Sequence, residues 1–456
     1  MLPILASALL AQSPAAPTPE VITVPQQVRP LPGSLDTTPM FNSNSPEVVQ
    51  QEGILLSTFP KQGKAHPEAH LEHAFSGRFD VFAHHIAKAL SPEDLRTLYL
   101  GVMIHNPGTS PVRLDVLQAA SYLSQPDAPF IKLEAMADNS EGKVYAGPGD
   151  RVTQDILRGR RQASWPAVIT LPPGESRMLL NVPIPVRELD PPINGRSTLA
   201  RLRSSGPVHV ASLAMFAKTT AAGEERAPTL EEWITLLQRA AVAGPRDKVP
   251  TPPGQPGQLI YGRVAGVAQG SKWTALVVDS QNEDRAQASA YRLTIPAAGS
   301  AFSYPLSSLD RGTFGTGQIQ TAPLVKRYPD TAYAAHGNYG VEYQLTLPLY
   351  NPTPEDQTVT VHFQTALKTD EKKAGLEFRN PPTNRVFYRG TVRVRFQDHR
   401  GTPRTRYTHL VQMQGQQGDP LVSIPLKPQQ KSLVQVNFIY PPDATPPQVL
   451  TVRTEP

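Results

Sequence analysis

Proline is the feature that most constrains how this chain folds. Forty-nine of its 456 residues are proline, about one in nine. Because proline lacks a backbone N–H and clashes with the preceding helical turn, this composition disfavours long helical bundles and coiled coils. The 39% of apolar residues is still enough to build a core. Cysteine is absent, which excludes disulfides, zinc thiolate sites, iron–sulfur clusters and thiol nucleophiles.

Short aliphatic segments bounded by proline, glycine or asparagine turns predict β-strands. In the first part of the chain the predicted strands are Leu98–Ile104, Val112–Val116, Val168–Leu171, Met178–Ile184 and Val208–Phe216. In the second part they are Leu259–Val267, Trp273–Val278, Tyr291–Ile295, Tyr343–Tyr350, Thr358–Phe363, Thr391–Phe396, Leu421–Leu426 and Leu433–Tyr440. Many short strands and little helix predict a mainly β protein with two antiparallel β-sandwich domains of the immunoglobulin-like kind.

The predicted division of the chain follows its proline clusters. Residues 226–257 are expected to hold one short helix and a proline-rich linker. The helix follows the capping signature of Thr229 and Glu232, and its apolar residues recur at helical spacing until the next glycine and proline. We therefore predict a first sandwich over residues 35–225 and a second over residues 258–456, each large enough to bury its own core.

Two motifs recur in the same order in both halves of the sequence. An Asn-Pro turn follows an apolar segment at Asn106 and again at Asn351. A second turn follows each of them, at Pro173 and at Pro428, after 66 and 76 residues. The recurrence indicates a duplicated sandwich unit, and coincidental strand patterning is the alternative.

An arginine-rich segment is the most distinctive electrostatic feature. Between Arg385 and Arg406, seven arginines stand against one acidic residue, Asp398. On a strand, Arg393 and Arg395 point to one face of the sheet and the neighbouring valines to the other. The segment predicts a strip that binds phosphate, sulfate or uronate groups, formed by Tyr388, Arg389, Arg393, Arg395, Arg404 and Arg406. The alternative is a solvated sheet face that blocks edge pairing.

Five of the eleven histidines lie close together in the sequence, at His66, His70, His73, His84 and His85. On a helix the first three would share one face, as a zinc or nickel site could use. Proline at position 67 argues against a continuous helix there. These residues are therefore weak metal candidates, with solvated or hydrogen-bonded histidines as the alternative, and no cofactor is predicted.

Catalytic motifs are absent from the sequence. It has no Gly-x-Ser-x-Gly elbow, no His-Glu-x-x-His and no Walker phosphate loop. Carboxylate pairs such as Asp150 with Asp155, or Glu141 with Asp150, are of the kind that glycoside hydrolases use, but acids in surface loops explain them more simply. We expect a protein that is not an enzyme, with a carbohydrate or cell-wall processing enzyme as the alternative.

The beginning of the chain is similar to a secretory signal. Leu2–Ala11 is apolar and small residues follow it, although no basic residue precedes it, and a disordered tail is the alternative. We predict a signal peptide over residues 1–13 and a proline-rich tether over residues 14–34. The apolar run is too short to span a bilayer. We therefore predict export to the periplasm, the cell surface or the medium. An exported protein with a net charge of only +5 is not expected to bind nucleic acid.

Two segments resemble the opening of a known family. They are Leu35–Pro60, LDTTPMFNSNSPEVVQQEGILLSTFP, and Gly77–Leu90, GRFDVFAHHIAKAL. Both are similar to an uncharacterised family of exported cyanobacterial proteins, classed as a domain of unknown function. The resemblance extends over most of the chain, and it implies an envelope location but no activity and no catalytic residue. We therefore predict a structural or binding protein that engages an anionic polysaccharide or another envelope component.

Overall fold

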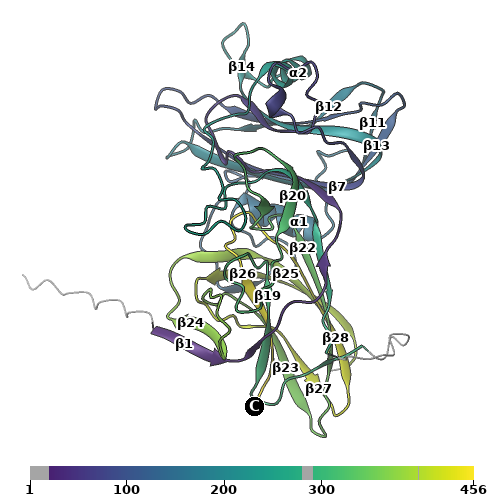
Figure 1. The fold of residues 1–456 in the computed structure, drawn as a ribbon, viewed down its shortest axis with the longest axis vertical. Helices are drawn as coiled ribbons and strands as arrows, with labels where there is room; N and C mark the ends of the chain where they lie inside the picture. Colours follow the sequence, from purple (N-terminus) through teal and green to yellow (C-terminus); the bar gives the residue numbers. More distant parts are fainter. Residues whose placement is uncertain (1–19, 280–290, 399) are drawn as a thin grey trace, which may run out of the picture.

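The computed structural model describes residues 20–279, 291–398 and 400–456. Two β-rich regions are stacked along the long axis of the molecule (Figure 1). We call them the upper and lower regions, and their junction the waist. Strands hold 47% of the residues and helices 5%, so the prediction of a mainly β protein is confirmed.

The upper region is built on one twelve-stranded sheet. Its strands are β4 (Pro39–Ser43), β5 (Val48–Val49), β6 (Gly53–Ser57), β7 (Phe75–Lys88), β8 (Leu98–His105), β9 (Val112–Leu123), β11 (Val168–Leu171), β12 (Ser176–Ile184), β13 (Ile193–Phe216), β16 (Ala265–Gln269), β20 (Ala322–Arg327) and β21 (Ala334–Ala335). The first half of β13 pairs with β7 and β9, and its second half pairs with β6 and β8. A register shift between Ser204 and Val208 separates the two halves.

The lower region has two sheets with a shared core between them. The larger sheet contains β3 (Ser34–Leu35), β10 (Met136–Asp138), β17 (Lys272–Leu276), β18 (Leu293–Thr294), β22 (Glu342–Tyr350), β25 (Val386–Gln397), β26 (Pro403–Met413) and β28 (Lys431–Ile439). The smaller contains β2 (Gln27–Val28), β19 (Ala301–Leu306), β23 (Gln357–Gln364), β27 (Pro420–Leu426) and β29 (Gln448–Thr454). Aromatic rings fill the core, with Tyr343 stacked on Phe438 at 5.2 Å and Phe363 lying 4.5 Å from Tyr388.

The prediction of two wholly antiparallel, immunoglobulin-like sandwiches is not confirmed. In the lower region β17 and β18 pair in parallel with β22, and in the upper region β4 and β5 pair in parallel with β7. Parallel neighbours need a long crossover connection, which a reading based on local hairpins does not anticipate. Two further pairs, β1 (Glu20–Pro25) with β24 (Gly375–Asn380) and β14 (Lys218–Thr219) with β15 (Glu225–Arg226), form small separate ribbons.

The two regions exchange strands, so the structure departs from the predicted domain boundaries. Residues 20–35 are no tether: they form β1, β2 and β3, which pair with strands of the lower region. β10 also leaves the first half of the sequence to pair with β26. In the opposite direction, β16 and β20 come from the second half and join the upper sheet. Hydrogen bonding to strands that are far away in the sequence decides where these strands lie. The composition of the chain carries no signal of that pairing.

The predicted helix is confirmed as α2 (Leu230–Arg239), at the upper end of the molecule (Figure 1). Thr229 accepts a hydrogen bond from the backbone N–H of Glu232, whose side chain accepts one from the backbone N–H of Thr229 in return. Trp233 and Leu237 are the buried side of this helix. A 3₁₀ turn, η1 (Pro67–Ala69), lies between β6 and β7. In the part of the chain that the structure describes, no helix is long and apolar enough to cross a membrane.

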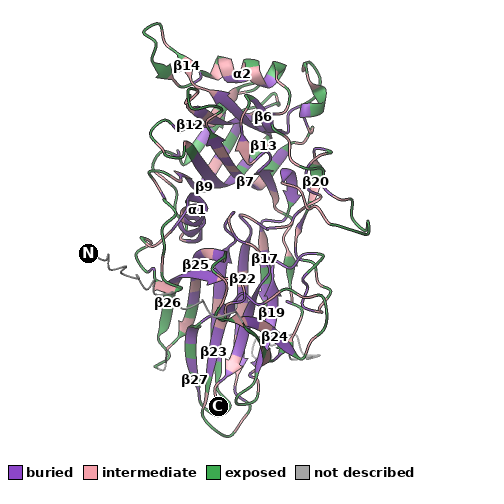
Figure 2. Ribbon diagram, turned by 90° about the vertical axis from the view of Figure 1, so that its left-hand side faces the viewer, coloured by how far each residue is buried: buried purple, intermediate pink, exposed green. Residues whose placement is uncertain are grey.

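A second helix, α1 (Pro148–Leu157), lies at the waist and was not predicted. Every residue except Arg151 is buried, because α1 contacts β9 and β13 above it and β25 and β28 below it (Figure 2). Asp150 and Asp155, expected in a loop, lie on this helix. Asp150 Oδ2 is 2.7 Å from His409 Nε2, and both side chains are fully buried. α1 therefore links the two regions through packing and a buried polar contact.

The recurrent Asn-Pro turns form the same structure in both regions. Nδ2 of Asn106 and of Asn351 lies within hydrogen-bond distance, 2.7–3.2 Å, of three carbonyl oxygens. The acceptors are Ser110, Leu171 and Pro172 for the first, and Glu355, Leu426 and Lys427 for the second. The flanking strands pair alike: β8 with β12 and β9 with β11, as β22 with β28 and β23 with β27. A four-strand unit thus occurs twice.

Candidate functional site

The predicted arginine strip is divided between the two faces of the lower sheet. Residues directly opposite each other in an antiparallel pair share a face. Arg393 and Arg395 of β25 stand opposite Tyr407 and Thr405 of β26, whereas Arg404 and Arg406 stand opposite Phe396 and Val394. Val392 and Val394 are fully buried, as predicted. The register between β25 and β26, which the sequence does not reveal, places the two arginine pairs on opposite faces.

Most members of the strip are occupied by contacts within the protein. Tyr388 is fully buried in the aromatic core. Arg389 pairs with Asp443 at 2.8 Å, and Arg393 donates to the carbonyl oxygen of Leu157 at the end of α1.

The remaining arginines differ in how far they are free. Arg404 pairs with Asp398 at 2.8 Å, and Arg406 donates to the carbonyl oxygen of Leu421. Only Arg395 of the six residues is exposed and forms no hydrogen bond or ion pair with a described residue. One free guanidinium does not make a polyanion-binding strip, so the predicted site is not brought together.

The five clustered histidines do not form a metal site either. His66 is bonded to Glu68, His70 to Ser57, His84 to Ser197, and His85 to Ser43 and Pro46, while His73 packs its ring against Phe75. Within residues 20–279, 291–398 and 400–456, no three His, Asp or Glu side chains are grouped closely enough to hold a metal ion. These histidines are structural partners of serines and backbone carbonyls.

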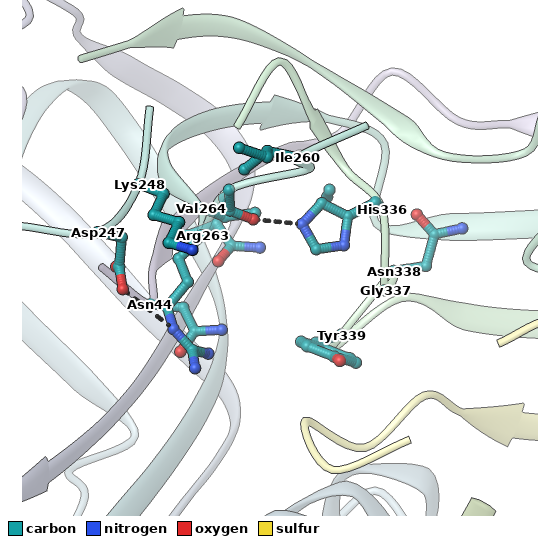
Figure 3. Close-up of a pocket in the computed structure, with 13 residues that line it drawn as sticks. Asn44, Asp247, Lys248, Ile260, Arg263, Val264, His336, Gly337, Asn338 and Tyr339 are labelled. Carbon is teal, nitrogen blue, oxygen red and sulfur yellow. Dashed lines mark hydrogen bonds and ion pairs between the residues drawn. The ribbon is translucent and has the colours of Figure 1, made fainter. Parts of the chain in front are cut away.

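A cavity of about 310 Å³ opens at the waist, where three distant segments meet (Figure 3). Its walls are the end of β4, part of the proline-rich linker with the segment that follows it, and the loop after β21. The lining residues are Asn42, Asn44, Asp247, Lys248, Ile260, Gly262, Arg263, Val264, Ala335, His336, Gly337, Asn338 and Tyr339. This volume is in the range of small-molecule sites.

Two buried asparagines bring unpartnered polar atoms to this waist cavity. Asn42 and Asn44 are 2% and 5% exposed, and Oδ1 of each accepts no hydrogen bond from a described residue. Residues two apart in an extended segment share a face, so both amides approach the same cavity. A buried acceptor left without a partner costs about 1–3 kcal/mol. A hydroxyl donor that reaches these oxygens, which have almost no accessible surface in this structure, would recover that free energy.

The charges around the waist cavity are partly neutralised. Arg263 forms an ion pair with Glu47 and lies 3.4 Å from Asp247. Asp247 also accepts a hydrogen bond from Ser45. Lys248 is exposed, and no described carboxylate lies within ion-pair distance of it. Lys248 is therefore the cation left for a ligand.

His336 and Tyr339 complete the lining. Burial lowers the pKa of His336, whose Nε2 donates a 2.6 Å hydrogen bond to the carbonyl oxygen of Gly262. The ring is therefore neutral and its Nδ1 is an acceptor. The hydroxyl of Tyr339 donates a hydrogen bond to the carbonyl oxygen of Ala444. A ligand in the cavity can therefore contact Tyr339 only through its aromatic ring. The cavity thus combines acceptors, one cation and an aromatic ring.

A second cavity, of about 350 Å³, is lined by Glu47, which forms an ion pair with Arg263 of the first cavity. Burial opposes ionisation of Glu47, but the hydrogen bond to His84 and the charges of His84 and Arg263 outweigh it and lower its pKa. Burial raises the pKa of Asp443 to about 6, against the opposing charge of Arg389. Two carboxyl groups with opposite shifts therefore line the same cavity.

Sequence reasoning missed both cavities because their residues come from segments far apart in the chain. Asn42, Asn44 and Glu47 lie in one short stretch, but Asp247 and Lys248 stand in the expected linker. The available signal was a polar run, FNSNSPE, that interrupts the apolar segments on either side.

Comparison with known proteins gives the family and no activity. A family model described as "Protein of unknown function (DUF3370)" matches residues 26–454. The chain belongs to this family. The match covers the two regions and the waist, so the contacts described above, except the pairing of β1 with β24, fall within the DUF3370 match. No curated protein matches the sequence.

Solved structures add no argument about this DUF3370 chain. The comparisons include Lac15 from a marine microbial metagenome, at 8% identity over 80% of this chain and 50% of that one, with a TM-score of 0.09. They also include the coconut allergen cocosin, at 10% identity over 84% and 83%, TM-score 0.09. Procruciferin, an 11S globulin from Brassica napus, has 12% identity over 89% and 83%, TM-score 0.10. The chain spans half the length of Lac15, and none of these scores indicates a shared fold.

Proposed function

We propose that this DUF3370 protein is a non-catalytic binding protein, exported to the periplasm or the cell surface, that holds an acidic polysaccharide of the envelope in its waist cavity. The observation that carries the proposal is the open waist cavity, which brings Lys248, Nδ1 of His336 and the ring of Tyr339 together beside the buried, unpartnered amide oxygens of Asn42 and Asn44. Sugar hydroxyls are donors and acceptors at once, so they fit the amide oxygens and Nδ1 of His336 together.

The acidic character of the ligand is inferred from charge. Lys248 is the cation of the cavity that lacks a carboxylate partner, and a uronate or sulfate group would supply one. The ring of Tyr339 offers an apolar face for the C–H groups of a sugar. Export rests on the apolar beginning of the chain and on the absence of cysteine, both features of the sequence.

Retention on an immobilised polyuronate, compared with an immobilised neutral glucan, tests the proposal. We expect retention on the polyuronate that weakens with salt, and an approximately tenfold loss of affinity for Asn44→Ala and for Lys248→Ala. Lys427→Ala, an exposed lysine in a turn of the lower region, is the matched control. Equal retention of all three variants, or no retention of the native protein, would overturn the proposal.

A second function, a carbohydrate-processing enzyme, is favoured by the second cavity. A glycoside hydrolase needs one carboxyl group that keeps its proton and one that is ionised. Asp443 and Glu47 line the same cavity and fit these two roles. Release of reducing ends from the retained polysaccharide, abolished by Asp443→Asn, would favour the enzyme; binding without any release favours the binding protein.

A further inference from the structure

A further cavity, of about 550 Å³, lies at the upper end of the molecule, away from the waist, next to α2, whose position Figure 1 shows. It lies between α2, the strands β8 and β12, and the loop that follows β6. One side of it is apolar. Phe59 and Met103 form its floor, and Leu230, Ile234 and Leu237 of α2 form its wall. Beneath it, Trp233 is fully buried in the same apolar cluster.

The opening of this cavity carries an unpaired positive charge. Lys64 lies with Nζ 5.7 Å from the centre of the Phe59 ring, and burial lowers its pKa. Among the described residues, no carboxylate lies within ion-pair distance of Lys64. Glu175 also lines the cavity, and it too is beyond that distance. The only other lysine in this loop, Lys61, is 50% exposed and pairs with Glu72. A partly buried ammonium without a counterion is costly, and an anionic ligand removes that cost.

Neutral imidazoles surround this ammonium group. His105 Nδ1 is 3.0 Å from the hydroxyl of Ser176. The rings of Phe59, His105 and His209 form a triangle, with centroid distances of 5.4 Å from Phe59 to His105, 5.7 Å from Phe59 to His209 and 6.4 Å from His105 to His209. Burial lowers the pKa of both histidines. The single N–H of neutral His209 donates to the carbonyl oxygen of His73. Ser176 and His105 bond to each other, which leaves one neutral donor of this pair, the Ser176 hydroxyl or the His105 Nε2–H, beside the charge of Lys64. Carboxylates are commonly held by this combination of one cation and a neutral donor.

We propose that this upper cavity binds a fatty carboxylate of medium chain length, with its carboxylate at Lys64 and its apolar chain along Phe59, Met103 and α2. The arrangement of one unpaired cation at the opening and a continuous apolar wall behind it matches an anionic headgroup on a single chain. The site is independent of the waist cavity and shares no residue with it.

Calorimetric titration of the full-length protein with decanoate tests the proposal, with decanol and decyltrimethylammonium as ligands of equal chain length. We expect decanoate to bind about tenfold more tightly than either, and to change the fluorescence of the buried Trp233. Lys64→Met and Lys64→Gln should each lower decanoate affinity about tenfold and leave decanol unchanged. Lys61→Met is the matched control and should bind decanoate as the native protein does.

Three results would overturn this proposal: decanol binding as tightly as decanoate, unchanged decanoate affinity in both Lys64 variants, or an equal loss in Lys61→Met. Thermal melting of each variant separates a lost ligand contact from a lost fold. Polyuronate retention at the waist should not change in the Lys64 variants, so failure of one proposal is distinguishable from failure of the other.

Discussion

The two asparagine turns, one in each region, share their hydrogen bonds and differ in what surrounds them. Asn106 and Asn351 are both fully buried and bind equivalent carbonyl oxygens. Behind the first lies a mixed cluster of aliphatic residues and phenylalanines such as Phe75 and Phe79. Behind the second lies the cluster around Phe438, in which tyrosines pack on phenylalanine. The comparison teaches that the polar contacts of the turn set the four-strand unit, while the core behind it is free to vary.

The second turn of each unit repeats the same contrast at the level of the backbone. Gly174 in the upper region and Gln429 in the lower region both have positive φ, 72° and 58°. Glycine adopts this conformation without strain, and glutamine does so at a cost. The side chain of Gln429 donates a 2.8 Å hydrogen bond to the carbonyl oxygen of Pro352, which offsets part of that cost. One geometry is therefore reached by two chemical routes.

The largest expected effect is loss of the asparagine side chains. Asn106→Ala and Asn351→Ala each remove a donor shared by three carbonyl oxygens, of which Pro172 and Lys427 keep a backbone N–H partner. We expect each substitution to lower the free energy of unfolding by about 4 kcal/mol. Denaturant unfolding followed by circular dichroism measures this. Asn→Asp at the same positions should also destabilise, because a carboxylate cannot donate. A loss below about 1 kcal/mol at one position only would break the equivalence of the two turns.

The second-largest expected effect is a difference between the two regions in how their stability depends on pH. Burial lowers the pKa of His70 and of His85 to about 4, so between pH 6.5 and 4 the unfolded chain binds protons that the folded protein does not. Stability contributed by each neutral histidine is present above about pH 6.5 and is lost as the pH falls towards 4, by about 3 kcal/mol per residue. Both histidines lie in the upper region, which should therefore unfold first.

Unfolding experiments at pH 7.5, 5.5 and 4.5 measure this dependence. His85→Gln should remove about half of the stability that the native protein loses between pH 7.5 and 4.5, whatever its effect on stability at pH 7.5. His66→Gln, at a partly exposed position, is the control. If His85→Gln leaves the slope of stability against pH unchanged, the acid sensitivity does not come from the buried imidazoles.

The smallest effect concerns the positive-φ position. A Cβ added at Gly174 meets no atom within 4 Å, so Gly174→Ala should cost only the backbone strain, about 1 kcal/mol. Gln429→Ala keeps the strain and loses the side-chain contact, so it should also destabilise slightly. Thermal melting resolves both shifts. A stabilising Gly174→Ala would contradict the conformation assigned to this turn.

Local patterns in the sequence predicted local structure well. Most of the predicted strands, the capped helix α2 and the recurrent Asn-Pro turns depend on residues close together in the chain and are present in the structure. The strand predicted over Leu259–Val267 begins only at Ala265, and the one over Tyr291–Ile295 is confined to Leu293–Thr294. Long-range pairing was not predictable: the register of β25 on β26 divides the arginines between two faces, and β1 to β3 join the lower region. The waist cavity joins Asn42 to Lys248 across two hundred residues, a contact without any local signal.

The exchange of strands across the waist has a consequence for dissecting the protein. A fragment ending at the proline-rich linker would lack β16 and β20, and the remaining fragment would lack β1, β2, β3 and β10. Each piece would expose unpaired backbone groups along a sheet edge, the template on which chains stick to one another. The two halves are thus obligate partners during folding, and separate expression should yield aggregates where the intact polypeptide yields monodisperse material.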